Sequence, residues 1–303
     1  MIKLQTAKKI LKPIKAYFYA PTNSGKTYGA LLTANGIVQS IRNVPEDEAY
    51  KHIVLIDTEY GRGTLYASLG AYNYIQFNAP YDVNILKQYI IEINNMPDID
   101  VVIIDSFTHF WSKTGGILDK KAEKDKTAQG NSYTNWQEFT MLFNKLVDEL
   151  LDSPKHILIT ARAKSDTVLV ENAQGKMAPK TFGLKAEMRD NFEFECDYVF
   201  NIDKETHNVL VEKGIGLESS YTPITPDFGK LLYKTQTDNA VTPVRNEDDV
   251  RRNIRTISYN NNLVQYIQLQ LSGKKLDDLD LDALVKLETN LIKEVKKGQV
   301  KKH

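Results

Sequence analysis

The sequence predicts an α/β fold with a mostly parallel central sheet flanked by helices, antiparallel edge strands and a C-terminal helical appendage. Within residues 1–232, short apolar runs rich in β-branched residues alternate with segments of helical spacing. Such alternation produces parallel strands joined by right-handed helical crossovers. The run IVLI before Asp57 is continuously apolar, as expected of a central strand covered on both faces. We therefore expect an α/β core in residues 1–232 and a charged helical region with a flexible tail in residues 233–303.

The first element in chain order is a strand, a loop and a helix within Ala16–Ala30. Residues 16–19 are apolar and aromatic, which indicates a buried strand, and a helix is expected from Lys26 to about Ser40. Between them, APTNSGKT matches the phosphate-binding P-loop pattern except at Ala20, where the pattern has glycine. Backbone N–H groups of such a loop surround an anionic phosphate, and the helix that follows points its positive dipole end at it. The segment therefore predicts a nucleotide-phosphate site.

Individual loop residues have distinct expected roles. Gly25 lets the backbone approach the phosphate closely and adopt unusual dihedral angles. Lys26 would reach the β- and γ-phosphates, and the Thr27 hydroxyl would ligate Mg²⁺. The expected nucleotide-binding set is Pro21, Thr22, Asn23, Ser24, Gly25, Lys26, Thr27 and Tyr28.

The next two predicted strands end in carboxylates. The second ends in Asp-Thr-Glu at residues 57–59, and the third, Val101–Ile104, is followed by Asp105. Ligands of parallel α/β sheets bind beyond the carboxyl ends of the strands. VVIID is a Walker B pattern, in which the aspartate holds Mg²⁺ through its water shell. Because Ser106 and not a glutamate follows, we expect Glu59 on the neighbouring strand to polarise the attacking water.

Later segments complete the expected core. A charged, polar segment is expected at Ser112–Asn135, a loop or hairpin at Arg162–Arg189, and two antiparallel edge strands at FECDYVFNID and HNVLVEKG. The other elements are helices at Leu86–Asn95 and Trp136–Leu151, a strand at Lys155–Ala161, and two C-terminal helical patterns at about 246–271 and 277–297.

The amino-acid composition bears on three properties of the protein: its overall charge, its disulfide bonds and its relation to a membrane. Lys plus Arg and Asp plus Glu both number 39, so no global basic field indicates nucleic acid, and any polyanion contact must come from local patches. The single cysteine, Cys196, excludes an intrachain disulfide framework. The sequence has no run of 18 apolar residues and no signal-peptide core. We expect a protein of the cytoplasm with no membrane partner.

The combination of these motifs resembles the RecA-like ATPase core. Within that class, it resembles the phage RecA-like AAA ATPases that are associated with single-strand annealing recombination. The motifs that carry the resemblance are PTNSGKT, VLIDTEYG, VVIIDSFT and ILITARAK, in the family's order, over about Ala16 to Lys230. The resemblance implies ATP and Mg²⁺ as cofactors, Lys26 and Thr27 as their ligands, and Asp105 as the Mg²⁺ partner. It also implies Glu59 as the water activator and, for a phage protein, the bacterial host cytoplasm as its location.

Two further roles follow only from the resemblance. The strand that ends in a γ-phosphate-sensing glutamine in bacterial recombinases ends here in Thr-Ala-Arg, which makes Arg162 a candidate sensor. RecA-like ATPases also place their nucleotide at a subunit interface, where a neighbour supplies a basic residue. Lys213, at the end of a predicted edge strand, is the candidate for that residue. The resemblance thus implies a homo-oligomer, either a ring or a filament.

Single-stranded DNA is the expected partner, with phage recombination or single-strand-binding proteins beside it. RecA-like ATPases bind DNA through loops that correspond here to 112–135 and 162–189. A basic track with an aromatic face is typical of single-strand binding, and Phe182 could stack a base. The basic residues of the two segments are Lys113, Lys120, Lys121, Lys124 and Lys126 in the first and Arg162, Lys164, Lys176, Lys180, Lys185 and Arg189 in the second.

Three function classes stay open at this point. The first is a DNA-dependent ATPase of recombination or replication. The second is a P-loop small-molecule kinase, although no arginine-rich lid pattern is present. The third is a nucleotide-dependent scaffold or helicase-loader-like protein with little turnover, which the alanine at position 20 would permit. Measuring ATP turnover with and without single-stranded DNA separates the three classes.

Overall fold

The computed structural model describes residues 6–127, 132–171, 177–217, 219, 221–238, 240, 247–260 and 263–300. It divides into two compact units, Met1–Ala240 and Val241–His303. The sequence analysis placed this division after residue 232, within the helix α7, which spans Pro226–Thr237. Because α7 packs along its length on α1 (Lys26–Arg42), it belongs to the first unit.

A mixed sheet forms the centre of the first unit, with the strand order β3-β2-β4-β5-β1-β7-β8-β9. Its strands are β1 (Lys15–Ala20), β2 (Ile53–Asp57), β3 (Asn73–Gln76), β4 (Val101–Asp105), β5 (His156–Glu171), β6 (Met177–Ala186), β7 (Tyr198–Ile202), β8 (Asn208–Lys213) and β9 (Tyr221–Pro223). The six neighbours from β3 to β7 are parallel, and β8 and β9 continue the sheet antiparallel. The predicted fold class is confirmed.

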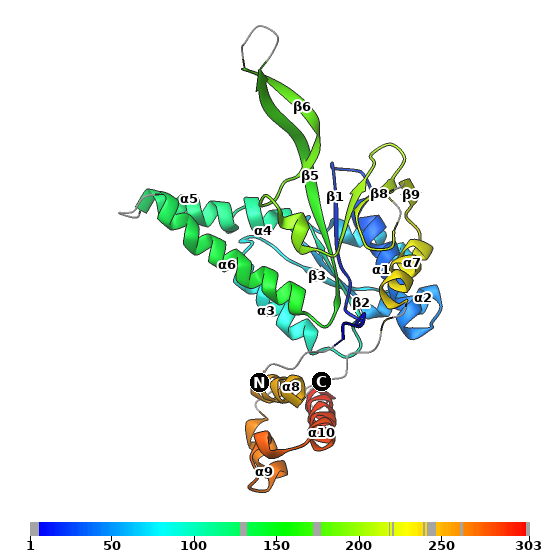
Figure 1. The fold of residues 1–303 in the computed structure, drawn as a ribbon, viewed down its shortest axis with the longest axis vertical. Coiled ribbons are helices and arrows are strands. Elements are labelled where there is room, and N and C mark those ends of the chain that lie inside the picture. The colour runs from blue at the N-terminus through cyan, green and yellow to red at the C-terminus, as the bar shows by residue number, and fades with distance from the viewer. Residues whose placement is uncertain are drawn as a thin grey trace. The chain divides into compact units, whose positions relative to one another are not determined.

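Helices cover both faces of this sheet (Figure 1). One face carries α1, α2 (Glu46–Ala49) and α7; the other carries α3 (Val83–Asn94), α4 (Thr108–Ser112), α5 (Ile117–Thr127) and α6 (Ser132–Asp152). Alternate strand residues supply the two cores. Val102 and Ile104 of β4 pack under α3 and α6, while Val101 and Ile103 pack under α1. This two-sided burial is the reason that the strand sequence is apolar at every position.

The strand β5 is longer than the sheet and leaves it as one arm of a ribbon. Its first residues pair in parallel with β1 and β4, and its residues from Ala163 onward pair antiparallel with β6. The ribbon projects from the sheet in Figure 1. The hairpin expected within 162–189 is therefore present, and the turn expected at 172–176 lies outside the described residues.

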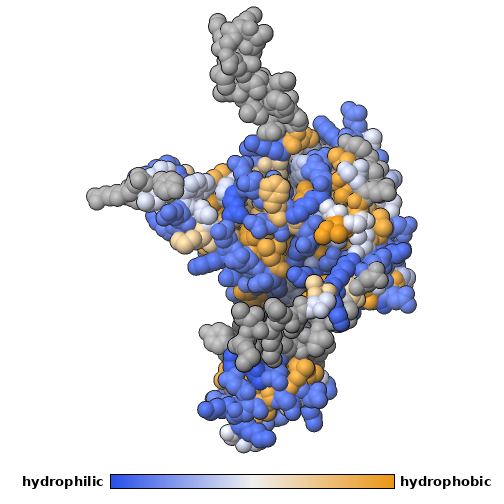
Figure 2. Space-filling view, in the orientation of Figure 1, coloured by the Kyte–Doolittle hydropathy of each residue, from blue (hydrophilic) through white to orange (hydrophobic). Residues whose placement is uncertain are grey.

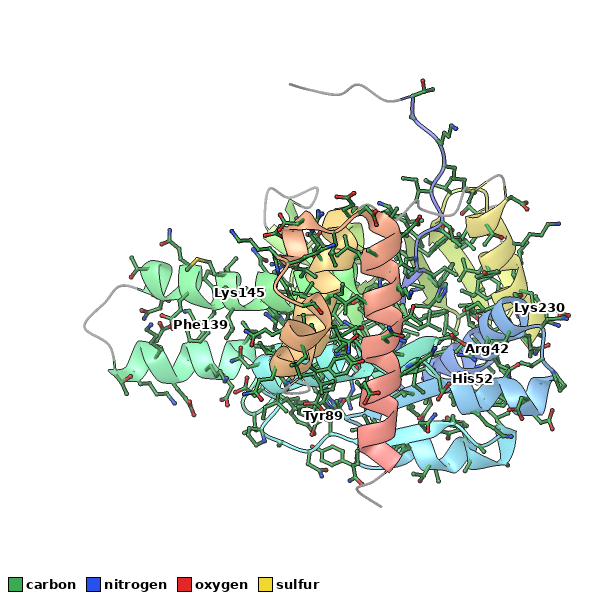
Figure 3. All side chains as sticks on the ribbon, turned by 90° about the horizontal axis from the view of Figure 1, so that it is seen from below. Arg42, His52, Tyr89, Phe139, Lys145 and Lys230 are labelled. Carbon is green, nitrogen blue, oxygen red and sulfur yellow. The ribbon has the colours of Figure 1, made fainter. Side chains whose placement is uncertain are left out.

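Two expectations about the core were wrong. The segment 112–135, which the resemblance matched to a DNA-binding loop, is mostly helical, because α5 and the start of α6 occupy most of it. Its Lys, Glu and Ala residues favour helix, and Lys121 pairs with Asp125 one turn later. Figure 3 shows Phe139 of α6 facing α5, where Lys124 lies 5.9 Å from its ring centroid.

The strand β7 is not an edge strand, because it pairs in parallel with β1. In addition, β9 covers part of β8.

The second unit is a small helical cluster of α8 (Glu247–Asn260), α9 (Val264–Leu271) and α10 (Leu281–Val300). Val250 and Ile254 of α8 pack with Leu284, Leu287 and Leu291 of α10. The helix α10 continues to residue 300, beyond the helical pattern expected at about 277–297, and residues 301–303 lie outside the described part. Among the described helices of either unit, none is sufficiently long and apolar to cross a bilayer.

Two glycines allow α1 and α7 to pack with their backbones in contact. A Cβ atom at Gly229 would lie 2.1 Å from the Thr33 carbonyl oxygen, and one at Gly36 would lie 1.7 Å from the Pro226 carbonyl oxygen. The neighbouring atoms are backbone, so they cannot yield by a rotamer change. The close approach requires glycine at both positions.

We expect Gly229→Ala to lower the free energy of unfolding by about 1–3 kcal/mol, as overpacked sites do. Alanine's higher helix propensity, worth about 1 kcal/mol, does not offset the overlap. The measurement is chemical denaturation. Lys230→Ala, on the same helix with a side chain 44% exposed, is the control and should change stability little. Equal stability of Gly229→Ala and the wild type would contradict the described packing.

Candidate nucleotide site at the carboxyl edge of the sheet

The loop between β1 and α1 turns sharply at two residues with left-handed backbones. Asn23 has a φ of 65° and Gly25 a φ of 83°, and α1 begins directly after Gly25. Ala20, the departure from the P-loop pattern, ends β1 as a buried strand residue paired with Arg162. An extended residue needs no glycine, so alanine is accommodated there. The loop thus presents the start of α1 at the carboxyl edge of the sheet.

The Lys26 ammonium is folded back onto this loop. Its Nζ donates hydrogen bonds to the carbonyl oxygens of Ala20 at 3.0 Å and Pro21 at 2.8 Å. Burial lowers the pKa of Lys26, and the carboxylates of Asp105 and Glu59 oppose that shift. The ammonium is therefore a desolvated cation held in place by dipoles, and an anionic phosphate would be a stronger partner than two carbonyls.

Other loop residues differ in exposure. Ser24 is fully buried, and its Oγ has no hydrogen-bond partner among the described residues. Thr22 and Asn23 are exposed. Tyr28 is 43% exposed, and its ring centroid lies 5.8 Å from that of Tyr66. The sequence analysis did not identify His207, whose Nδ1 lies 3.2 Å from the Ser24 carbonyl oxygen and thus places the β7–β8 turn against the loop.

Asp105 ends β4 and meets the start of α1. The Thr27 hydroxyl donates to Asp105 Oδ2 at 2.5 Å, and the Thr160 hydroxyl donates to Asp105 Oδ1. Burial raises the pKa of Asp105, and the two hydroxyl groups oppose that shift. A hydroxyl and a carboxylate in contact are the protein oxygens that a Mg²⁺ ion in a P-loop site requires. Thr27 and Asp105 thus fit the expected metal site.

Glu59 forms a two-pronged ion pair with Arg162. Arg162 Nε donates to Oε1 at 2.9 Å and its Nη2 donates to Oε2 at 2.6 Å. Burial alone would raise the pKa of Glu59, but the hydrogen-bonded guanidinium outweighs it and the net direction is downward. The predicted water activator, Glu59, and the predicted sensor, Arg162, therefore lie in contact and are hydrogen-bonded to each other.

The sheet register explains why these charges converge. Asp57 of β2 is level with Asp105 of β4, and Ala20 of β1 is level with Arg162 of β5. The charges of Asp105, Glu59 and Arg162 all influence the pKa of Lys26. The carboxyl edge thus brings together two cations, Lys26 and Arg162, and three carboxylates, Asp57, Glu59 and Asp105, from four strand ends.

The sequence analysis missed the groups that hold Glu59 in place. Asp57 Oδ1 accepts from the Glu59 N–H at 2.5 Å, and Asp57 Oδ2 accepts from the Gly63 N–H at 2.8 Å and the Tyr74 hydroxyl at 2.9 Å. The Thr58 hydroxyl accepts from the Ser106 N–H at 2.8 Å, which ties β2 to β4. A carboxylate at a strand end can act in a reaction or can accept hydrogen bonds that stabilise a turn. The hydrogen bonds in the structure assign the turn to Asp57 and leave Glu59 as the candidate for the reaction.

His109 of α4 also went unnoticed, because an isolated histidine has no motif. It is fully buried, and its Nε2 lies 3.7 Å from Glu59 Oε1. Its Nδ1 lies 3.0 Å from the Thr58 carbonyl oxygen. Burial lowers the pKa of His109, with the Arg162 charge acting in the same direction and Glu59 opposing it.

Lys213 lies away from this cluster. It ends β8 level with Val199 of β7, three residues before the site end of that strand, and its Nζ donates to the carbonyl oxygens of Phe194 at 2.9 Å and Cys196 at 2.6 Å. A role in a neighbouring subunit's site would require the ammonium to leave both carbonyls. The proposed role in trans stays a prediction.

The described lysines of the two expected DNA segments lie in different surroundings. In α5, Lys120 pairs with Asp82 at 2.7 Å, Lys121 with Asp125 at 2.5 Å, and Lys124 with Glu138. In the ribbon, Lys164 and Lys185 are exposed. Lys176 lies outside the described residues, as do the side chains of Lys180 and Phe182. Hydrophilic residues dominate the described face in Figure 2, and hydrophobic residues appear there in separate clusters.

Comparison with known proteins identifies the family of the first unit. A family model described as "AAA domain" matches residues 12–242. A KaiC-like protein of the hyperthermophilic archaeon Pyrococcus horikoshii is similar in structure, with 14% sequence identity and a TM-score of 0.35, over 73% of this chain and 93% of that chain. No curated protein matches this sequence.

Proposed function

This chain belongs to the AAA domain family, and we propose that it binds and hydrolyses ATP with Mg²⁺ and acts on single-stranded DNA in phage-type recombination or replication. The observation that carries the proposal is the convergence of a P-loop lysine, a hydroxyl–carboxylate pair and a second carboxylate at one sheet edge. Lys26 supplies the cation, Thr27 and Asp105 the pair, and Glu59 the second carboxylate. Phosphoryl transfer needs these groups because its catalysis is mostly positioning and charge stabilisation.

Each group has a distinct task in hydrolysis. Lys26 pairs with the β- and γ-phosphate oxygens in place of its own loop carbonyls. Thr27 and Asp105 would hold Mg²⁺, which would supply charge neutralisation on the phosphates. Glu59 accepts a hydrogen bond from the attacking water and orients it toward the γ-phosphorus. Arg162, on the adjacent strand end, is the cation that senses the γ-phosphate if it exchanges Glu59 for that group.

One observation favours the alternative of a nucleotide-dependent scaffold with little turnover. In the described state, both Glu59 oxygens are bonded to Arg162, so the carboxylate is not free to orient water. Hydrolysis requires this pair to loosen. A protein in which the pair persists with ATP bound would bind nucleotide and release it unhydrolysed.

Support for single-stranded DNA comes from the ribbon. Arg162 and the ribbon share the strand β5, so that one continuous element joins the nucleotide site to a projecting arm (Figure 1). The lysines of the ribbon supply the basic track that phosphate backbones require. Three of the α5 lysines are paired with acids, so that contact with phosphates would require them to leave those carboxylates. Assembly into a ring or filament, with Lys213 acting in trans, is part of the same proposal, and a strictly monomeric protein with full turnover would contradict that part.

The decisive experiment measures phosphate release from ATP with and without single-stranded DNA. We expect Mg²⁺-dependent turnover that rises when the DNA is added. Nucleotide binding without turnover under both conditions would favour the scaffold. Phosphate transfer that requires a small-molecule acceptor would establish a kinase instead.

Charge reversal at Lys176, Lys180 and Lys185 tests the ribbon in the same assay. The triple variant should lose DNA stimulation and retain basal turnover. Its plot of log affinity against log salt should flatten by about 2, because each lost contact to a single strand removes about 0.7. Reversal at Lys120, Lys121 and Lys124 is the comparison set. If only that set weakens DNA binding, the DNA site lies on α5 and the ribbon assignment is wrong.

A further inference from the structure

The geometry around Glu59 points to one more functional group, and this inference rests on the proposed ATP hydrolysis. We propose that His109 receives, through Glu59, the proton that the attacking water loses. Glu59 touches the water, and His109 is a positioning and proton-holding residue behind it.

The hydrogen-bond partner of Nδ1 decides the tautomer. Nδ1 lies 3.0 Å from the Thr58 carbonyl oxygen, which can only accept a hydrogen bond. Nδ1 therefore donates, and in the neutral ring Nε2 has a lone pair and no hydrogen. The Tyr81 hydroxyl donates to the same carbonyl oxygen at 3.2 Å, and its ring lies 5.0 Å from the imidazole. The ring is thus fixed in orientation.

The second nitrogen is left open in a buried place. His109 is 0% exposed, and Nε2 has no hydrogen-bond partner among the described residues. A buried polar atom without a partner is costly, and a purely structural histidine usually has both nitrogens satisfied. Nε2 instead lies 3.7 Å from Glu59 Oε1. An acceptor nitrogen beside a carboxylate gains a bond only when a proton lies between them.

The chemical step balances as follows. The water oxygen forms a bond to the γ-phosphorus, and the bond from that phosphorus to the bridging oxygen breaks, with the electron pair leaving on ADP. One water proton passes to Glu59 Oε1 and from there to His109 Nε2. The result is an imidazolium beside a carboxylate. The proton then leaves to the released phosphate or to solvent, and the neutral ring is restored.

The surroundings of His109 act in both directions: burial, Arg162 and Lys113 disfavour the imidazolium, and the Glu59 carboxylate favours it. The groups that face His109 are Glu59, Arg162, Tyr81, Tyr60 and, more distantly, Lys113. Arg162 lowers the pKa of Glu59, which makes that carboxylate a weak base. Burial lowers the pKa of His109 below its usual 6.5, so the ring is neutral at pH 7 and able to accept. Of the two groups, the imidazole has the unpartnered acceptor, Nε2, that can hold the proton.

The test is His109→Asn, which places an amide N–H near the position of Nδ1 and removes Nε2. The bond to Thr58 can persist, so the fold and ATP affinity should be retained while kcat falls by about 10²-fold or more. The wild-type rate should fall in acid as the pH drops through the lowered pKa of His109, because protonated His109 cannot accept. In the variant the part of this acid loss that belongs to His109 should disappear. Wild-type kcat or an unchanged pH profile in the variant would overturn the proposal.

Two controls separate this role from a structural one. His52→Asn makes the same change at a half-buried histidine whose Nδ1 also lies beside a main-chain carbonyl, that of Asp98 at 2.6 Å, and it should change neither rate nor profile. His52 is labelled in Figure 3. If His109→Asn does not fold, His109→Gln repeats the test, since its amide fills the position of Nε2 but cannot take the proton.

A readout without turnover distinguishes this proposal from the proposed function. The titration of His109, followed by NMR in full-length protein, should move to lower pH in Glu59→Gln because the imidazolium loses its carboxylate. An unchanged titration would refute the coupling whether or not ATP is hydrolysed. A wild type that shows the coupling but no turnover with or without DNA would refute the hydrolase and leave the pair established.

Discussion

Replacing Lys26 with alanine is expected to weaken ATP binding by roughly 30- to 5,000-fold, the equivalent of about 2–5 kcal/mol for losing one partner of a desolvated charge pair. Lys26 is the P-loop cation, and its ammonium already lies against the loop through two carbonyl bonds. No other lysine among the described residues begins a helix at a phosphate-binding loop. Isothermal titration with ATP and Mg²⁺ measures the loss.

The same substitution should leave the fold intact. Burial lowers the pKa of Lys26, which means that the folded protein disfavours its charged form. Removing a desolvated cation should not lower the unfolding temperature, and could raise it, as at many functional sites. Lys51→Ala, at an exposed lysine paired with Glu48, is the control for losing a positive charge. Unchanged ATP affinity in Lys26→Ala would refute the P-loop assignment.

Motifs with fixed spacing gave the sequence predictions that agree best with the structure. The P-loop, the Walker B strand and the carboxylate at residue 59 lie within single segments, and a parallel sheet necessarily gathers their ends at one edge. The fold and the positions of Lys26, Asp105 and Glu59 were therefore predictable. The ion pair between Glu59 and Arg162 joins residues 103 positions apart, and no local pattern specifies it.

The predictions of local structure were wrong where the residue composition of a segment is compatible with two structures. The charged stretch 112–135 has the composition of a solvated loop and also that of an exposed helix, and its packing on α6 through residues such as Phe139 selects the helix. Strand β7 has the ordinary pattern of an edge or an internal strand, and only its register with β1 decides. His109 and Asp57 were missed because their roles depend on hydrogen bonds to backbone groups of other segments.

We expect Glu59→Gln to bind ATP and Mg²⁺ and to lose turnover by about 10²–10⁴-fold, the usual contribution of one positioned base. Glutamine has the shape of glutamate, but its amide cannot take a proton from water. It also places an NH₂ group opposite Arg162, where the wild type has a second carboxylate oxygen at 2.6 Å from the guanidinium. Phosphate release and ATP affinity, measured on the same sample, separate the loss of chemistry from the loss of binding.

Stability against pH gives this variant a second signature. The pKa of Glu59 is lowered below 4.5 by Arg162 in the folded protein, so the pair stabilises the fold above about pH 4.5 and ceases to do so as pH falls through the lowered value. Glu59→Gln should therefore be less stable than the wild type at pH 7, and the difference should vanish in acid. Glu187→Gln makes the same change at a carboxylate that also influences Arg162, and it should retain turnover. Full turnover in Glu59→Gln would remove Glu59 from the mechanism, and His109 would then have no carboxylate through which to act.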